Sequence, residues 1–155
     1  MGLDTSHNCW HGGYGSFMQW RIELAKAACL PPLMLMEGFF KEGDIYDPFK
    51  DYKERLSGFG CEVLAHQYYE NLPIRWGILR PDPICKLLYH SDCSGVIPWR
   101  QCKRLANRLE ELLPELSDKK GMMRHYVLIS WRMVTEQFID GLRKAYIAKE
   151  SVRFR

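Results

Sequence analysis

"IPWRQCKRLANRLEELLPEL", residues 97–116, is the stretch that decides the fold class. Its apolar side chains recur three and four positions apart, which is the spacing of one face of an α-helix; they are Cys102, Leu105, Ala106, Leu109, Leu112 and Leu113. Pro98 suits the first turn of a helix, because its ring already has a helical φ and its missing N–H would have no partner there. The stretch predicts an amphipathic helix that packs on a core.

Two further helices are predicted on either side of this one. Upstream, "GGYGSFMQWRIELAKAAC" (residues 12–29) carries an apolar stripe at helical spacing and is followed by Pro31 and Pro32, which end helices. Downstream of the turn "SDKKG", "MMRHYVLISWRMVTEQFIDGLRKAYIAKE" (residues 122–150) predicts one long helix. Its expected core residues are Val127, Val134, Phe138, Leu142 and Ala145.

Short strands are predicted between and beyond the helices. "PICKLLYH" (residues 83–90) is a compact apolar run closed by the turn "SDCSG" and is typical of a buried strand, and the alternating tail "SVRFR" (residues 151–155) predicts a strand at a sheet edge. Residues 34–80 are rich in glycine and aromatic residues without a sustained period, which indicates an irregular insertion or lid. The sequence therefore predicts an α+β fold, with three principal helices on a small sheet, in a single domain over residues 1–155.

Composition excludes several classes of protein. The 155 residues are 46% hydrophobic and 26% charged, and no segment approaches the roughly 20 apolar residues of a membrane span. The net charge of +3 is small and its cations are interspersed with acids, so we expect no nucleic-acid partner. Six cysteines without a CxxC pair and without a signal peptide predict reduced thiols in the cytoplasm. The small size favours a homodimer, the commonest assembly.

The first block that could carry chemistry is "GLDTSHNCWHGG", residues 2–13. If its opening residues form a strand, the turn that follows presents His7, Trp10 and His11 at the end of the sheet. Gly12 and the glycine after it allow a close approach of the backbone to a ligand, and the free N–H groups at the start of the next helix attract an anion such as phosphate.

The second block is "YHSDCSGVIPW", residues 89–99, and it repeats the same order of strand, polar turn with a glycine, and helix start. His90 and Asp92 lie in its turn. If the two strands neighbour each other, we expect His7, His11, His90 and Asp92 to converge at one edge of the sheet.

Two metal sites are alternatives for that cluster. Asp92, Ser94 and Gly95 fall on positions of a calcium-binding EF-hand loop, but His90 and Gln101 stand where that loop needs its first and its bidentate carboxylate. A zinc site would use His7, His11, His90 and Asp92, with Cys9 as a further ligand, although the spacing matches no strong motif.

The third alternative is a pocket without metal for a nucleotide-like molecule. Aromatic side chains offer faces for a base and arginines offer forked donors for phosphate; these residues are Trp10, Tyr14, Trp20, Trp76, Tyr89, Arg21, Arg75 and Arg80. Asp4 and Asp92 can accept hydrogen bonds from ribose hydroxyls. The competing structural interpretation is that the aromatic side chains form the core and the histidines satisfy local hydrogen bonds.

Several segments resemble a group of small proteins encoded by bacteriophages and bacterial genomes. They are "GLDTSH" and "WHG" near the start, "LLYHSDCSG", "LANRLEELLPEL" and the closing "FIDGLRKA". The likeness spans most of the chain, but members of that group usually carry acidic residues where this chain has Ser94 and Val96. The resemblance implies a phage context, and phages encode small proteins that capture or cleave the nucleotide signals of bacterial immunity.

We therefore expect a non-enzymatic binding protein of phage type that sequesters a nucleotide-derived immune signal, such as a cyclic nucleotide or a molecule like cyclic ADP-ribose, without a cofactor. Its predicted ligand-binding residues are Asp4, His7, Trp10, His11, Gly12, Arg21, Trp76, His90 and Asp92. The alternative is a small phosphodiesterase or related hydrolase that uses His7, His11, His90 and Asp92, with or without a metal. A third option is an inhibitor that binds another protein through the aromatic insertion.

Overall fold

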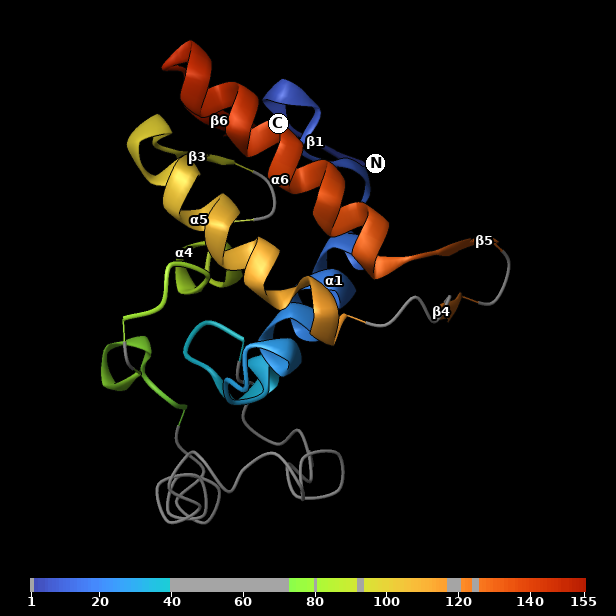
Figure 1. The fold of residues 1–155 in the computed structure, drawn as a ribbon. Coiled ribbons are helices and arrows are strands. Elements are labelled where there is room, and N and C mark those ends of the chain that lie inside the picture. The colour runs from blue at the N-terminus through green and yellow to red at the C-terminus, as the bar shows by residue number, and fades with distance from the viewer. Residues whose placement is uncertain (1, 40–72, 80, 92–93, 117–120, 124–125) are drawn as a thin grey trace.

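Two antiparallel strand pairs join the beginning and the end of the chain. The computed structural model describes residues 2–39, 73–79, 81–91, 94–116, 121–123 and 126–155 (Figure 1). Strand β1 (Gly2–Asp4) pairs with β2 (His11–Gly13), and β3 (Gly95–Ile97) pairs with β6 (Val152–Phe154). The prediction of a strand in the tail is confirmed.

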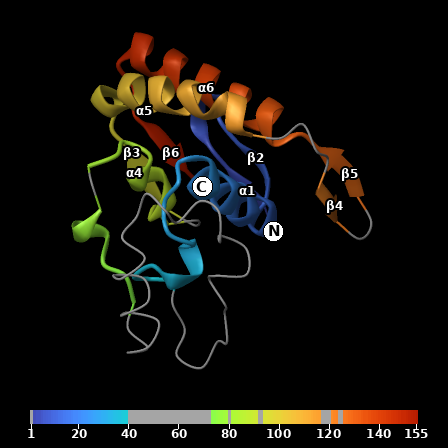
Figure 2. The same cartoon turned by 60° about the horizontal axis from the view of Figure 1, so that its bottom comes forward.

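Backbone hydrogen bonds connect these two pairs to each other. Asp4 and Arg155 exchange two of them, with N···O distances of 3.1 and 2.8 Å, and Thr5 forms an antiparallel bridge with Phe154. The strands therefore follow one another in the order β2, β1, β6, β3, and Figure 2 shows β3 and β6 beside the N-terminal strands. This junction brings the two predicted chemical blocks to the same strand, β6.

Three long helices accompany the strands, as the sequence predicts, and the fold is α+β. They are α1 (Tyr14–Ala27), α5 (Trp99–Leu112) and α6 (Trp131–Ala148). Helices α5 and α6 pack side by side as one layer above the strands and α1 (Figure 2). The shorter elements are η1 (Ser6–Asn8), η2 (Leu33–Leu35), η4 (Trp76–Ile78), α4 (Cys85–Leu88), η5 (Leu113–Glu115), β4 (Gly121–Met123) and β5 (Tyr126–Ile129).

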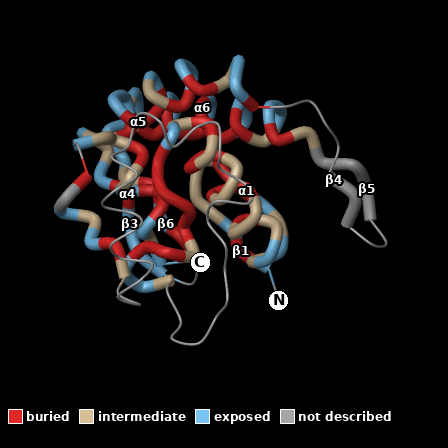
Figure 3. Tube along the Cα trace, turned by 90° about the horizontal axis from the view of Figure 1, so that it is seen from below, coloured by how far each residue is buried: buried red, intermediate tan, exposed pale blue. Residues whose placement is uncertain are grey.

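Aromatic rings fill the centre of the core. Trp10 stacks on Trp20 with centroids 5.2 Å apart and meets Phe17 edge-on at 5.0 Å, while Phe138 packs on Trp20 at 4.8 Å. The indole N–H of Trp20 donates to the Oγ1 of Thr135 at 2.9 Å, so this buried polar group is satisfied. One hydrophobic cluster runs from the first strand to the last, and the buried segments of Figure 3 follow it.

Two predicted elements are wrong. Residues 83–90 contain the short helix α4 and not a strand, and its buried residues Ile84, Leu87 and Leu88 have helical spacing. The predicted helix from Met122 begins only at Trp131, because residues 121–129 contain strands β4 and β5, which pair with each other. The run "YVLI" in β5 is β-branched and aromatic, which favours a strand.

The predicted insertion over residues 34–80 falls largely on residues 40–72, which lie outside the described part of the chain. At its two ends, Met36 and Ile74 form a parallel bridge, and the N–H of Ile74 donates to the carbonyl of Leu35 at 2.8 Å. The insertion therefore leaves and re-enters the fold at neighbouring points. No helix within the described residues has the length and apolar character needed to cross a membrane.

Candidate functional site

The three predicted site histidines each have a different partner. The ring nitrogens of His7 lie 3.0 Å from Ser6 Oγ and 3.0 Å from Glu150 Oε2. His11 Nδ1 lies 2.7 Å from Asp4 Oδ1, and the ring of His90 packs on Phe154 with centroids 4.1 Å apart. Among the described residues no three histidine, cysteine or acidic side chains gather as metal ligands.

Asp92, which the metal and hydrolase alternatives need, lies outside the described residues. Its predicted meeting with the histidines therefore stays a prediction. Gly95 lies against His90: a Cβ atom added at Gly95 would be 2.7 Å from the His90 ring. The φ of Gly95 is +128°, a conformation that also favours glycine. A residue with a side chain at position 95 would collide with the His90 ring, so this position requires glycine.

One predicted contact to a base is corrected at the first block. Trp10 is only 5% exposed and its ring faces Phe17 and Trp20, so it cannot stack on a ligand. Gly12 lies in β2 opposite Leu3, and its predicted close approach to a ligand stays a prediction. Helix α1 does begin directly after the glycines, with Gly13 as its N-cap.

Arg21 is also corrected, from a phosphate ligand to a structural residue. Its side chain is 1% exposed, and its guanidinium donates to the carbonyl oxygens of Leu88 at 3.1 Å and His90 at 2.7 Å. The rings of Phe17 and Phe39 lie 4.9 and 5.3 Å from its guanidinium carbon. A cation enclosed in this way holds the end of α4 against α1 and does not face solvent.

Trp76 packs against Tyr89, which lines a cavity that the sequence did not predict. Its indole N–H donates to the carbonyl of Glu37 at 3.0 Å, and its ring meets Tyr89 edge-on with centroids 5.6 Å apart. Tyr89 is 48% exposed and lines the cavity, so the two rings form a small aromatic surface at its rim.

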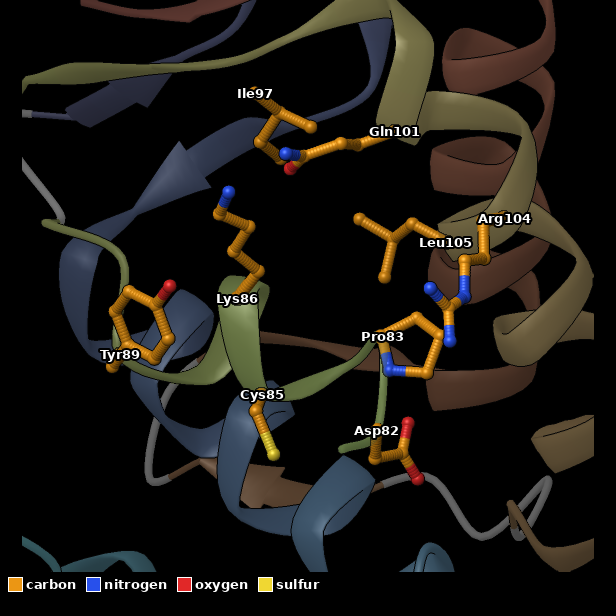
Figure 4. Close-up of a pocket in the computed structure, with 9 residues that line it drawn as sticks. All are labelled: Asp82, Pro83, Cys85, Lys86, Tyr89, Ile97, Gln101, Arg104 and Leu105. Atoms are coloured by element: carbon orange, nitrogen blue, oxygen red, sulfur yellow. The ribbon is translucent and has the colours of Figure 1, made fainter. Parts of the chain in front are cut away.

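The cavity has a volume of about 270 Å³ and lies between α4, β3 and α5 (Figure 4). Ile97 and Leu105 are buried and give it an apolar wall. Its lining residues are Asp82, Pro83, Cys85, Lys86, Tyr89, Ile97, Gln101, Arg104 and Leu105.

Asp82 fixes the loop that forms one side of this cavity. Its carboxylate accepts from Arg108 Nε at 3.2 and 2.9 Å, and its Oδ1 also accepts the N–H of Ile84 at 3.0 Å, at the start of α4. The hydrogen bond with Asp82 raises the pKa of Arg108 above its ordinary value. These contacts tie α4 to α5 and keep the cavity open between them.

The polar groups of the cavity come from both helices. Figure 4 shows Lys86 extending from α4 toward the amide of Gln101 on α5, with Arg104 on the same helix. Gln101 Oε1 is buried and has no hydrogen-bond partner among the described residues. An unpaired buried acceptor costs about 1–3 kcal/mol, so this oxygen is ready to accept from a ligand or water.

The lining of this cavity contains one thiol, that of Cys85. Burial, with a smaller contribution from the nearby Asp82 charge, raises the pKa of the Cys85 thiol, so Cys85 is held as a thiol and not as a nucleophilic thiolate. None of the nine lining residues is a histidine that could serve as a base.

The sequence does contain a signal for this site. Asp82 followed by Pro83 is a typical helix start, with an N-terminal acceptor and a proline in the first turn. If residues 82–88 are taken as a helix that starts at this Asp-Pro pair, Lys86 lies on the exposed side of that helix and not on a strand. Gln101 and Arg104 border the apolar stripe of α5 three residues apart, so they share one side of that helix.

Three cationic or amide side chains and one exposed ring surround an apolar wall in this cavity, which is the usual make-up of a small-molecule site. No family model matches the chain, and neither a curated protein nor a solved structure matches it.

Proposed function

We propose that the protein captures a small nucleotide-derived molecule, such as a cyclic nucleotide or a molecule like cyclic ADP-ribose, in the cavity between α4 and α5. The observation that carries this proposal is the unpartnered Oε1 of Gln101, which lines the same cavity as Lys86 and Arg104. An acceptor that needs a donor and two cations that attract phosphate are the complement of a nucleotide.

Each side chain has a role in this complex. Lys86 and Arg104 bind phosphate oxygens, and the planar fork of the arginine can do so with two hydrogen bonds. Gln101 Oε1 accepts an N–H from the base. The exposed ring of Tyr89, supported by Trp76, stacks on the base, a contact typically worth about 1–3 kcal/mol.

The size of the cavity limits how much of the ligand enters. At about 270 Å³ it is close to the lower end of small-molecule pockets. The base therefore occupies the apolar part, and the phosphates lie at the open rim beside Lys86 and Arg104. In a phage-infected bacterium, such capture would remove an immune signal, a setting that rests on the sequence resemblance to phage proteins.

Ligand recovery tests this proposal directly. Purified protein is mixed with cyclic dinucleotides and cyclic ADP-ribose isomers, separated from unbound ligand and denatured, and the released molecule is identified by mass. We expect one of these ligands to be released intact. Retention of none of them, or release of a cleaved product only, contradicts capture.

Matched variants connect the ligand to the cavity. Gln101→Met and Lys86→Gln should each reduce retention about tenfold, the usual effect of losing one hydrogen bond to a charged or buried group. Gln19→Met on α1 and Lys103→Gln on α5 make the same changes at residues that do not line the cavity, and they should leave retention within about twofold. Equal losses in all four variants would contradict this location.

A hydrolase is the second candidate, and one contact favours it. The 2.7 Å contact between His11 Nδ1 and Asp4 Oδ1 is the way a carboxylate orients an imidazole as a general base. Both side chains are open to solvent, at 78% and 63% exposure. If the recovery experiment yields a cleaved product, and His11→Ala abolishes cleavage while the ligand is still retained, the hydrolase replaces capture.

A further inference from the structure

A second cavity, of about 420 Å³, lies where the η1 turn meets the connection between α6 and β6. It shares no lining residue with the cavity between α4 and α5. Its lining residues are Ser6, His7, Lys149, Glu150, Ser151, Arg153 and Arg155.

This lining is strongly cationic. Among the side chains of the lining, Lys149, Arg153 and Arg155 contribute three positive charges, and Glu150 contributes one carboxylate. Arg153 lies on β6 and Arg155 directly follows that strand, where its backbone exchanges hydrogen bonds with Asp4. Alternation along the chain places both arginines on the face opposite the buried Val152 and Phe154. Within the described part of the chain, no ion pair uses any of these three cations.

The frame of the cavity is fixed by hydrogen bonds. Ser6 Oγ accepts the N–H of Arg153 at 2.9 Å and lies 3.0 Å from His7 Nδ1. The backbone of Lys149 has a φ of 57°, and its N–H and that of Glu150 donate to Tyr146 and Ala145 at 3.2 and 3.0 Å. These two bonds satisfy carbonyls at the end of α6, which reduces the negative potential that a helix C-terminus presents to an anion.

We propose that this second cavity binds the phosphomonoester or pyrophosphate group of a small molecule. Two arginines, a lysine, a serine pair and an imidazole supply more donors than a single carboxylate can accept, and they match an anion with several oxygens. Glu150 competes with that anion for one of these donors, because its carboxylate lies 3.0 Å from His7 Nε2. The incoming phosphate displaces Glu150, whose side chain is 68% exposed and free to move into solvent.

This role of Glu150 gives opposite expectations for two variants. Arg153→Gln removes a cation, so the affinity for pyrophosphate should fall about tenfold. Glu150→Gln removes the competing charge, so the affinity should rise about threefold. Arg132→Gln is the charge-matched control, since Arg132 pairs with Glu136 on the exposed side of α6, and it should stay within about twofold of the unmodified protein.

The experiment is a titration of the nitrogen-15-labelled protein with pyrophosphate at about 0.15 M salt, which screens exposed surface charges. Saturable shifts are expected at the amides of Ser6, Lys149 and Arg153. Absence of saturable shifts there at millimolar pyrophosphate, or an Arg153→Gln affinity within twofold of the unmodified protein, overturns the proposal. Shifts confined to Lys86 and Gln101 also overturn it, while they support the nucleotide cavity between α4 and α5.

Discussion

The guanidinium of Arg21 on α1 lies 2.7 Å from the carbonyl oxygen of His90, at the far end of α4. The same group donates to the carbonyl oxygen of Leu88 at 3.1 Å, so one side chain from the first helix holds two carbonyl groups of a distant segment. Tyr89 lies between those two residues and lines the cavity between α4 and α5. The position of that aromatic ring therefore depends on a buried cation.

Replacing Arg21 by methionine should lower the free energy of unfolding by about 3 kcal/mol, because two inward-facing carbonyls lose their donor while the apolar volume is kept. Urea denaturation measures the change. Arg132→Met removes an exposed pair on α6 and should change stability by less than about 0.5 kcal/mol. A loss below about 1 kcal/mol in Arg21→Met would mean that the buried guanidinium is not structural.

Gly141→Ala should destabilise the protein by about 2 kcal/mol, since its Cβ would lie 2.5 Å from Cys9 Sγ and 2.9 Å from the carbonyl oxygen of His7. Gly15→Ala is the matched control on α1, where nothing lies within 4 Å of the added methyl group. This control should be neutral or stabilise by about 0.5 kcal/mol. Thermal unfolding of both variants checks the pair, and equal effects would contradict the close contact of α6 with η1.

The stability of the protein should fall in alkaline solution because of Cys9. Burial raises the pKa of this thiol from 9.0 to about 12. Between these two values the unfolded chain releases a proton that the folded chain keeps, so the free energy of unfolding decreases with pH, by about 1.4 kcal/mol per pH unit from this group. The contribution is fully present below pH 9 and is lost as the pH rises toward 12.

Comparison with Cys9→Ala isolates that contribution from the titration of other groups. Urea denaturation at several pH values should give a less steep alkaline slope for this variant than for the unmodified protein. Parallel slopes for the two proteins would show that Cys9 ionises in the folded state as easily as in the unfolded state.

Arg108→Met should loosen the loop beside the cavity between α4 and α5, because Asp82 loses its only ion-pair partner among the described residues. We expect a stability loss of about 1 kcal/mol and weaker ligand retention in the recovery experiment. Arg143→Met breaks the exposed pair with Glu110 and should affect neither quantity. Unchanged retention in Arg108→Met would show that this loop does not shape the cavity.

Apolar spacing within single segments predicted the helices well. The stripe of residues 97–116 identifies α5, and the face of α1 that is buried carries Phe17, Trp20, Arg21 and Leu24. The same spacing places Arg21 on the core face, one turn after Phe17, so its position predicts burial although its residue type is typical of a phosphate ligand.

Short segments were harder to predict for a physical reason. A compact apolar run such as residues 83–90 satisfies both strand and helix patterns, and only Asp82 before Pro83 favours the helix that forms. In residues 122–130 the helical pattern continues into a strand, and Ser130 marks the true start of α6 by accepting the N–H of Met133 at 3.3 Å.

The candidate site could not be predicted from motifs, because its polar groups come from two helices whose contact is set by tertiary packing. Lys86 on α4 and Gln101 on α5 have ordinary surroundings in the sequence, and the tertiary contacts that bring these helices together include the ion pair of Asp82 with Arg108. Likewise, the alternation of apolar and polar residues over 151–155 predicts a strand. That alternation does not indicate which segments the strand pairs with, and in the structure these are β3 and the residue after β1.

The pairing of Thr5 with Phe154 has a consequence for biosynthesis. A ribosome releases β1 and β2 long before β6. During most of translation the segment at β1 therefore has no β6 backbone to pair with. Until β6 emerges, the edge of β1 and the rings of Phe17 and Trp10 are accessible to chaperones and to neighbouring nascent chains. The protein should therefore acquire its native sheet only after translation has passed residue 154.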